Sequence, residues 1–306
     1  MATSDPQCAE VLRRVAAWGA PAVPSAEQWR ALERRRFAEF AAAPEPVAAV
    51  LDTHAPAPGG PVPVRVYRPA GATSASTFVW LHGGGWVVGS PELCDDQARA
   101  LANASACVVV SADYRLAPEH PFPNGLEDCL AVVRWVAAGG AGPCERLVVG
   151  GDSAGGNLAA AVTLLARDVG EPAIDLQVLV HPAVQRNADT RSMRRFAEGH
   201  GLSAAAMRWF WAQYTGAAAE PLVSPLLAGS LEGLPPAIVV TAGCDILRDE
   251  GEEYARRLAA AGVPVTLRRY EGMIHGFLAH AGVIDRARDA FGDIGADIRA
   301  HDGVTA

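Results

Sequence analysis

Short apolar runs recur along the chain and predict buried β-strands. Several are apolar throughout, as expected where helices cover both faces of a sheet. The runs span Val64–Tyr67, Thr77–Leu81, Cys107–Ser111, Leu147–Val149, Leu176–Val180, Ile238–Thr241 and Val265–Arg269. Helical patterns at Leu126–Val136 and Leu158–Ala166 lie between them. This alternation predicts an α/β fold with a mostly parallel sheet flanked by helices.

The beginning of the chain has a helical pattern instead. Between Glu10 and Ala42, apolar residues at helical spacing predict two short amphipathic helices, separated by a turn at Pro21 and Pro24. The segment Pro44–Pro63, rich in proline and glycine, is interpreted as a connector. We therefore expect N-terminal cap helices in residues 1–50 and a main α/β domain in residues 51–306.

An insertion at about residues 185–220 interrupts the alternation. It begins as a polar, arginine-rich loop and continues as an aromatic helical pattern over Ser203–Tyr214. So much aromatic surface has to be buried against another part of the protein. Two interpretations stay open: ordinary packing, or a lid that covers a pocket together with the N-terminal helices.

Composition narrows the function classes. The chain has 306 residues, half of them apolar, and 26 arginines against 34 acidic residues give a net charge of −8. Without a basic stripe, the protein is a poor candidate for binding nucleic acid or anionic lipid. Six scattered cysteines form no zinc-binding pattern, so we expect reduced thiols and no metal. No secretory signal or membrane-spanning run is evident, so a cytoplasmic protein without membrane insertion is expected.

The segment Gly151–Gly156 reads GDSAGG and carries the strongest chemical signal. It follows the strand Leu147–Val149 and precedes a helix expected to begin near Asn157. A G-x-S-x-G motif in this setting is a nucleophile elbow, in which glycines permit a sharp turn and expose the serine. Ser153 is therefore the candidate nucleophile. The alternative is a plain glycine-rich turn.

A serine nucleophile needs a base and an orienting acid. His275 lies in a glycine-flanked loop after the last predicted strand, and Asp245 directly follows the strand Ile238–Thr241. The order Ser153, Asp245, His275 is the order of α/β-hydrolases. Taken alone, Asp245 could instead cap a helix, and Asp249 is the rival carboxylate.

The segment His82–Trp86 reads HGGGW and follows the strand Thr77–Leu81. Backbone N–H groups of such a loop can stabilise an oxyanion, so Gly83 and Gly84, with Ala154, are the expected donors. Phosphate binding is disfavoured because neither G-K-[ST] nor G-x-G-x-x-G occurs. Trp86 is a candidate wall of the substrate pocket, although packing is an equal alternative.

These motifs resemble those of the bacterial hormone-sensitive-lipase-like esterases. The resemblance covers about residues 60–290 and includes the segments Asp113–Pro123, Asp245–Gly251 and His275–Phe277. It implies an eight-stranded sheet, a helical cap, no cofactor, a possible homodimer and hydrolysis of short to medium acyl esters. It also implies that Asp113–Pro123 supports the oxyanion loop. Ile246 departs from the family, which commonly has proline there.

The sequence therefore predicts a serine carboxylesterase that forms an acyl-enzyme on Ser153 and acts on a small-molecule ester. An acyltransferase, a tailoring deacetylase or an amidase could use the same residues, and a non-catalytic ligand-binding protein could use the same fold. The arginine-rich stretch Arg186–Arg195 could recognise an anionic substrate group, but a solvated loop explains it as well.

Overall fold

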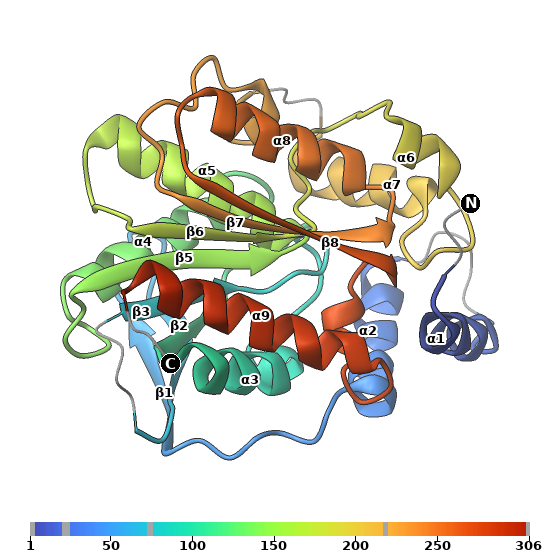
Figure 1. Ribbon diagram of the computed structural model, residues 1–306, viewed down its shortest axis with the longest axis horizontal. Helices are drawn as coiled ribbons and strands as arrows, with labels where there is room; N and C mark the ends of the chain where they lie inside the picture. The colour runs from blue at the N-terminus through green and yellow to red at the C-terminus, as the bar shows by residue number, and fades with distance from the viewer. Residues whose placement is uncertain (1–3, 20–24, 72–75, 217–219, 304–306) are drawn as a thin grey trace.

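A computed structural model describes residues 4–19, 25–71, 76–216 and 220–303. Within these ranges the strands form one eight-stranded sheet in the order β1-β2-β4-β3-β5-β6-β7-β8 (Figure 1). β2 is antiparallel to both its neighbours, and the remaining pairs are parallel. The strands are β1 (Ala49–Ala55), β2 (Val62–Arg68), β3 (Ser76–Leu81), β4 (Val108–Ala112), β5 (Arg146–Asp152), β6 (Leu176–Val180), β7 (Ala237–Cys244) and β8 (Val265–Ile274). The expected α/β fold is confirmed.

Helices cover both faces of the sheet. The α-helices are α1 (Pro6–Ala16), α2 (Ala26–Phe40), α3 (Asp95–Ser105), α4 (Asn124–Ala137), α5 (Ala154–Val169), α6 (Arg191–Arg195), α7 (Ala204–Thr215), α8 (Arg248–Ala260) and α9 (Asp285–His301). Short 3-10 helices span Glu92–Cys94, Pro225–Leu227 and Phe277–His280. Figure 1 shows α5 and α8 on one face and α3 and α9 on the other, with α1, α2, α6 and α7 beyond the carboxyl ends of the central strands.

The central strands are buried as their composition predicts. Every residue of β3, β6 and β7 is buried, because helices cover both faces. The outer strand β1 was not predicted and lies in the segment interpreted as a connector. Its first four residues are exposed, so the strand needs no continuous apolar run, and its sequence includes Asp52 and His54. An edge strand of this kind gives a weak sequence signal.

Two boundaries differ from the sequence analysis. The helix after the nucleophile motif begins at Ala154 and not near Asn157. The two N-terminal helices are present, but the turn predicted at Pro21 and Pro24 lies outside the described residues. No helix in the described ranges is long and apolar enough to cross a membrane. All six cysteines are unpaired there.

The helix α2 is fixed over one end of the sheet. Ser25 and Gln28 form a capping box at its N-terminus, which satisfies free backbone groups there. Arg30 donates to the Val87 carbonyl at 3.0 Å and forms an ion pair with Glu119 at 2.7 Å. These contacts hold α2 against the loop that follows β3 and against the segment that follows β4.

Candidate active site

Ser153 lies in the sharp turn between β5 and α5. Its backbone has φ 54° and ψ −115°, a conformation that costs a residue other than glycine about 1–3 kcal/mol. A Cβ atom on Gly151 or Gly155 would lie 2.2 or 1.9 Å from the Leu81 carbonyl oxygen. Only glycine fits at these two positions, which is the reason for the G-x-S-x-G spacing.

The three sequence-predicted residues of the triad meet in space. Ser153 Oγ lies 2.8 Å from His275 Nε2, and His275 Nδ1 lies 2.8 Å from Asp245 Oδ2. A carboxylate can only accept, so Nδ1 carries a proton and Nε2 of the neutral ring can accept the hydroxyl proton. Asp245 Oδ1 also accepts the Leu247 N–H at 2.9 Å. The three side chains directly follow the ends of β5, β7 and β8, which lie at the same sheet edge with β6 between β5 and β7.

Burial and charge act on Asp245 in opposite directions. The side chain is almost fully buried, which raises the pKa of its carboxyl. The charge and hydrogen bond of His275, and the Leu247 N–H, outweigh burial and lower that pKa below its usual value. Asp245 is therefore ionised at neutral pH and can orient the imidazole.

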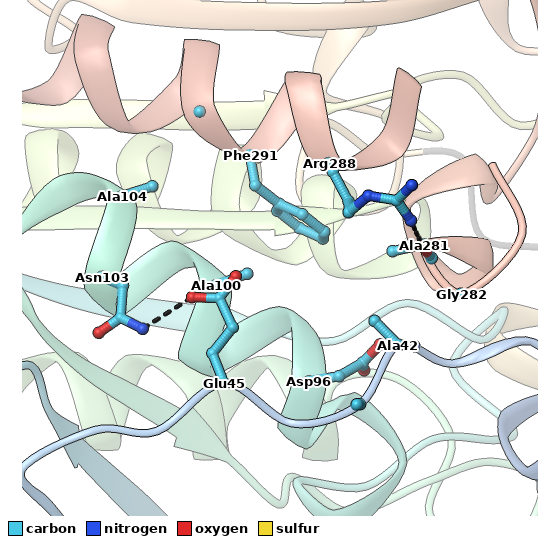
Figure 2. Close-up of a pocket in the computed structure, with 12 residues that line it drawn as sticks. Ala42, Glu45, Asp96, Ala100, Asn103, Ala104, Ala281, Gly282, Arg288 and Phe291 are labelled. Atoms are coloured by element: carbon cyan, nitrogen blue, oxygen red, sulfur yellow. Dashed lines mark hydrogen bonds between the residues drawn. The ribbon is translucent and has the colours of Figure 1, made fainter. Parts of the chain in front are cut away.

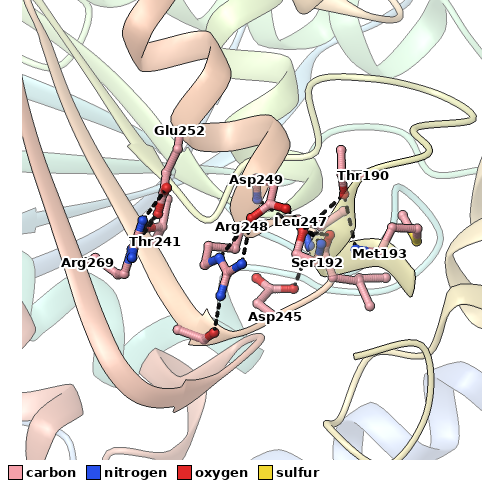
Figure 3. Close-up of polar contacts among 12 residues, drawn as sticks. Thr190, Ser192, Met193, Thr241, Asp245, Leu247, Arg248, Asp249, Glu252 and Arg269 are labelled. Atoms are coloured by element: carbon pink, nitrogen blue, oxygen red, sulfur yellow. Dashed lines mark hydrogen bonds and ion pairs between the residues drawn. The ribbon is translucent and has the colours of Figure 1, made fainter. Parts of the chain in front are cut away.

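The rival carboxylate Asp249 has other partners. Its side chain accepts the Ser192 N–H at 2.7 Å and pairs with Arg248 at 2.7 Å (Figure 3). These contacts tie the beginning of α8 to α6. Asp249 has no hydrogen bond to His275 among the described residues, so the geometry favours Asp245.

The glycine loop after β3 differs in one detail from the prediction. The Gly83 N–H donates to Asp152 Oδ1 at 2.8 Å, so it is not free to bind an oxyanion, and its choice as a donor is corrected. No acceptor among the described residues contacts the N–H of Gly84, Gly85 or Ala154. Burial raises the pKa of Asp152 to about 6, although the Gly83 N–H lowers it.

The segment Asp113–Pro123 contacts the glycine loop. The Tyr114 hydroxyl donates to the His82 carbonyl at 2.7 Å, and the two rings stack with centroids 4.3 Å apart. The Ala117 N–H donates to the Trp86 carbonyl at 2.8 Å. Burial lowers the pKa of His82 to about 4, so its ring stays neutral. These contacts fix the backbone of the loop.

Trp86 is not a wall of the pocket. Its side chain is buried and stacks on Tyr214 with centroids 4.4 Å apart and an interplanar angle of 4°. It also packs on Trp211 at 4.3 Å. The aromatic residues of α7 therefore pack on the loop, and the packing alternative is correct.

A cavity of about 210 Å³ lies in front of Ser153. Besides Ser153 and His275, the glycine loop 83–85 and the charged residues Glu33 and Arg36 line it. The apolar part of the wall comes largely from three helices. These residues include Val11 and Leu12 of α1, Trp29 and Leu32 of α2, and Met207 and Phe210 of α7. Phe210 packs on Trp29 with ring centroids 4.9 Å apart. The N-terminal helices and the insertion thus both line the cavity.

A larger hollow of about 710 Å³ lies elsewhere, between α3, α9 and the chain that follows α2. Figure 2 shows Phe291 and Arg288 of α9 on one side and Asn103 of α3 on the other. No residue of the triad lines it. Its size alone is therefore no evidence of an active site.

The arginine-rich stretch Arg186–Arg195 does not line the cavity in front of Ser153. The Arg194 side chain is largely exposed and pairs with Asp189 at 2.5 Å. Arg195 lies over the Phe196 ring at 5.2 Å. Arg191–Arg195 form the short helix α6, so the stretch is not a loop throughout, although the Arg194 side chain is exposed to solvent.

Two buried polar residues near the site were missed by the sequence analysis. His181 packs against His275, and Glu250 of α8 accepts the Val184 N–H at 2.8 Å. His181 directly follows β6, at the same sheet edge as Ser153 and Asp245, and that position was the available signal. Glu250 lies among charged residues and gave no signal.

Comparison with known proteins agrees with this geometry. The family described as alpha/beta hydrolase fold matches residues 78–279. The carboxylic ester hydrolase LipN of Mycobacterium tuberculosis is 45% identical over 242 residues, which are 75% of this chain and 64% of LipN. The esterase LipI of the same organism is 37% identical over 84% of both chains.

A solved structure shares the fold over nearly the whole length. The crystal structure of a thermostable esterase from Pseudomonas putida has a TM-score of 0.93 at 35% identity and covers 98% of both chains. The family expected from the motifs is thereby confirmed. The chain belongs to the alpha/beta hydrolase fold family, and among its relatives LipN is a carboxylic ester hydrolase and LipI an esterase.

Proposed function

We propose that the protein is a serine carboxylesterase that hydrolyses short to medium acyl esters through an acyl-enzyme on Ser153. The observation that carries the proposal is the continuous chain of hydrogen bonds from Ser153 through His275 to Asp245, each 2.8 Å long. Such a chain at the end of a strained strand-to-helix turn is the arrangement that activates a serine.

The reaction takes place in two halves. Ser153 Oγ attacks the ester carbonyl carbon while His275 Nε2 takes its proton, and Asp245 stabilises the imidazolium. The imidazolium then returns the proton to the leaving alcohol as the acyl-enzyme forms. A water molecule, deprotonated by His275, attacks the acyl carbon and releases the acid and Ser153.

The oxyanion of each tetrahedral intermediate needs backbone donors. Gly84, Gly85 and Ala154 are the proposed set, because their N–H groups have no acceptor among the described residues. The N-terminus of α5 begins at Ala154 and favours negative charge beside Ser153. One such donor contributes about 3–4 kcal/mol to the transition state.

The small cavity supports the choice of substrate class. Its volume of about 210 Å³ is below the ~300–1,000 Å³ of most ligand pockets, which favours a short acyl chain. We further propose that α1, α2 and the insertion at about 185–220 act as a cap, because both segments line the cavity. A homodimer and a cytoplasmic location remain predictions.

Hydrolysis of p-nitrophenyl esters from acetate to laurate tests the proposal. Wild type is expected to turn over the short esters, and Ser153→Ala to lose about three or more orders of magnitude. Ser230→Ala, an exposed serine, serves as the matched control and should match wild type. Product analysis with added alcohol separates hydrolysis from acyl transfer. An active Ser153→Ala variant would refute the proposal.

A further inference from the structure

The structure assigns His181 as a positioning residue for His275, and this inference rests on the proposed triad. The two rings lie against each other, with centroids 4.6 Å apart and an interplanar angle of 34°. On another side His181 meets the edge of Phe277, with centroids 6.1 Å apart and planes at 89°. The side chain has no exposed surface. His275 therefore packs on a ring that has no room to move away.

The backbone of His181 joins the strands that supply the triad. Its N–H donates to the Val240 carbonyl of β7 at 2.6 Å. The preceding carbonyl, of Val180 in β6, accepts the Ser153 N–H at 2.8 Å. His181 is thus held between the strand end that carries Ser153 and the strand end that leads to Asp245.

His181 has an unusual backbone conformation. Its φ is +35°, in the left-handed region that favours glycine. A strained backbone persists where the surrounding structure holds it, and such residues concentrate at functional sites. Here the strain directs the imidazole toward His275. A glycine would relieve the strain but would remove the ring.

The hydrogen bonding of the ring defines its chemical state. His181 Nδ1 lies 2.6 Å from the Val180 carbonyl oxygen, which can only accept, so Nδ1 carries the proton. Nε2 is buried and has no partner among the described residues. The titratable groups whose charges act on the ring are His275, beyond β8, and Asp245, after β7. Burial and His275 lower the pKa of His181 to about 3, although Asp245 raises it.

A neutral ring at this place serves catalysis in two ways. It blocks rotation of the His275 imidazole away from Ser153 and Asp245, because the rotating ring would collide with it. It also offers an uncharged aromatic face to the imidazolium that forms when Ser153 attacks, and such faces attract cations. A charged His181 would repel that imidazolium.

The test compares a ring with an aliphatic side chain at position 181. His181→Phe keeps the aromatic face, and His181→Leu removes it at a similar volume. For a short p-nitrophenyl ester, we expect His181→Phe to keep kcat within about threefold and His181→Leu to lose about tenfold or more, with KM nearly unchanged. The acid limb of the kcat/KM pH profile should move down by about half a unit only in His181→Leu.

The inference would be overturned if the two variants had equal kcat and equal pH profiles. It would also be overturned if His181→Phe lost as much kcat as His181→Leu. Should His181→Leu fail to fold, His181→Asn replaces it, because asparagine tolerates the left-handed conformation and lacks the ring. It is expected to lose kcat like His181→Leu, and full activity would overturn the inference. Ser153→Ala is measured in parallel. If this variant stays active, the proposed function has failed; if it is inactive, the results at position 181 test the role of His181 alone.

Discussion

Glu250 is a buried carboxyl group whose replacement by glutamine should stabilise the protein at neutral pH. Its side chain in α8 is 1% exposed, and Oε1 accepts the N–H groups of Val184 and Gln185 at 2.8 and 3.1 Å. Oε2 has no partner in the described part of the chain. Burial raises the pKa of Glu250 to about 8, despite the two N–H groups, and the charge of Asp245 raises it further.

The sign and size of the effect follow from proton linkage. The unfolded chain loses this proton near pH 4.5, whereas the folded protein keeps it to about pH 8. Between these values folding takes up a proton, so the free energy of unfolding falls by about 1.4 kcal/mol per pH unit as pH rises. At pH 7 the total is about 3–4 kcal/mol. Glu250→Gln keeps the carbonyl acceptor without this penalty.

Urea unfolding at pH 5, 6, 7 and 8 measures the effect. Glu250→Gln should exceed wild type in stability by an amount that grows with pH across this range. Glu253→Gln, on the exposed side of the same helix, is the matched control, because it loses only a surface ion pair with Arg256, worth less than about 1 kcal/mol. If Glu250→Gln is less stable than wild type at every pH, Glu250 is ionised in the fold and the reasoning is wrong.

Three further predictions concern the site and its support. Asp245→Asn should fold normally and lose about 10⁴-fold in kcat by the serine-protease precedent, and near-wild-type kinetics would exclude it as the acid. Gly155→Ala should prevent folding or abolish activity, because its Cβ would lie 1.9 Å from the Leu81 carbonyl oxygen. As the control, Gly292→Ala has open space around its Cβ and should raise the free energy of unfolding by about 0.5–1 kcal/mol, measured by thermal denaturation. Phe210→Ala should cost about 3–5 kcal/mol of stability and move the preferred p-nitrophenyl ester to a longer acyl chain, and an unchanged chain-length profile would count against the cavity wall.

The parts of the fold that the sequence predicts are those that depend on local pattern. Buried strands such as β6 need continuous apolar runs, so Leu176–Val180 was predicted with its observed bounds. The edge strand β1 faces solvent and lacks such a run, so it was missed. Its pairing with β2 becomes visible only when the sheet is assembled.

In the candidate site, too, residues marked by a local pattern were predicted and residues defined by distant contacts were not. Ser153, Asp245 and His275 could be identified because each follows a strand, and their order matches the fold. The Gly83 N–H was assigned wrongly because its partner Asp152 lies 69 residues away in the chain. The position of His181 directly after β6 indicates the sheet edge, but its stacking on His275 is seen only in the folded structure.

Covalent labelling of Ser153 tests the central claim most directly. Wild type is incubated with a p-nitrophenyl alkylphosphonate, which phosphonylates an activated serine, and the adduct is located by peptide mass spectrometry. The account predicts one adduct per chain, on the peptide that contains Ser153, together with loss of all esterase activity. An adduct on another residue, or esterase activity that survives complete labelling of Ser153, would contradict it.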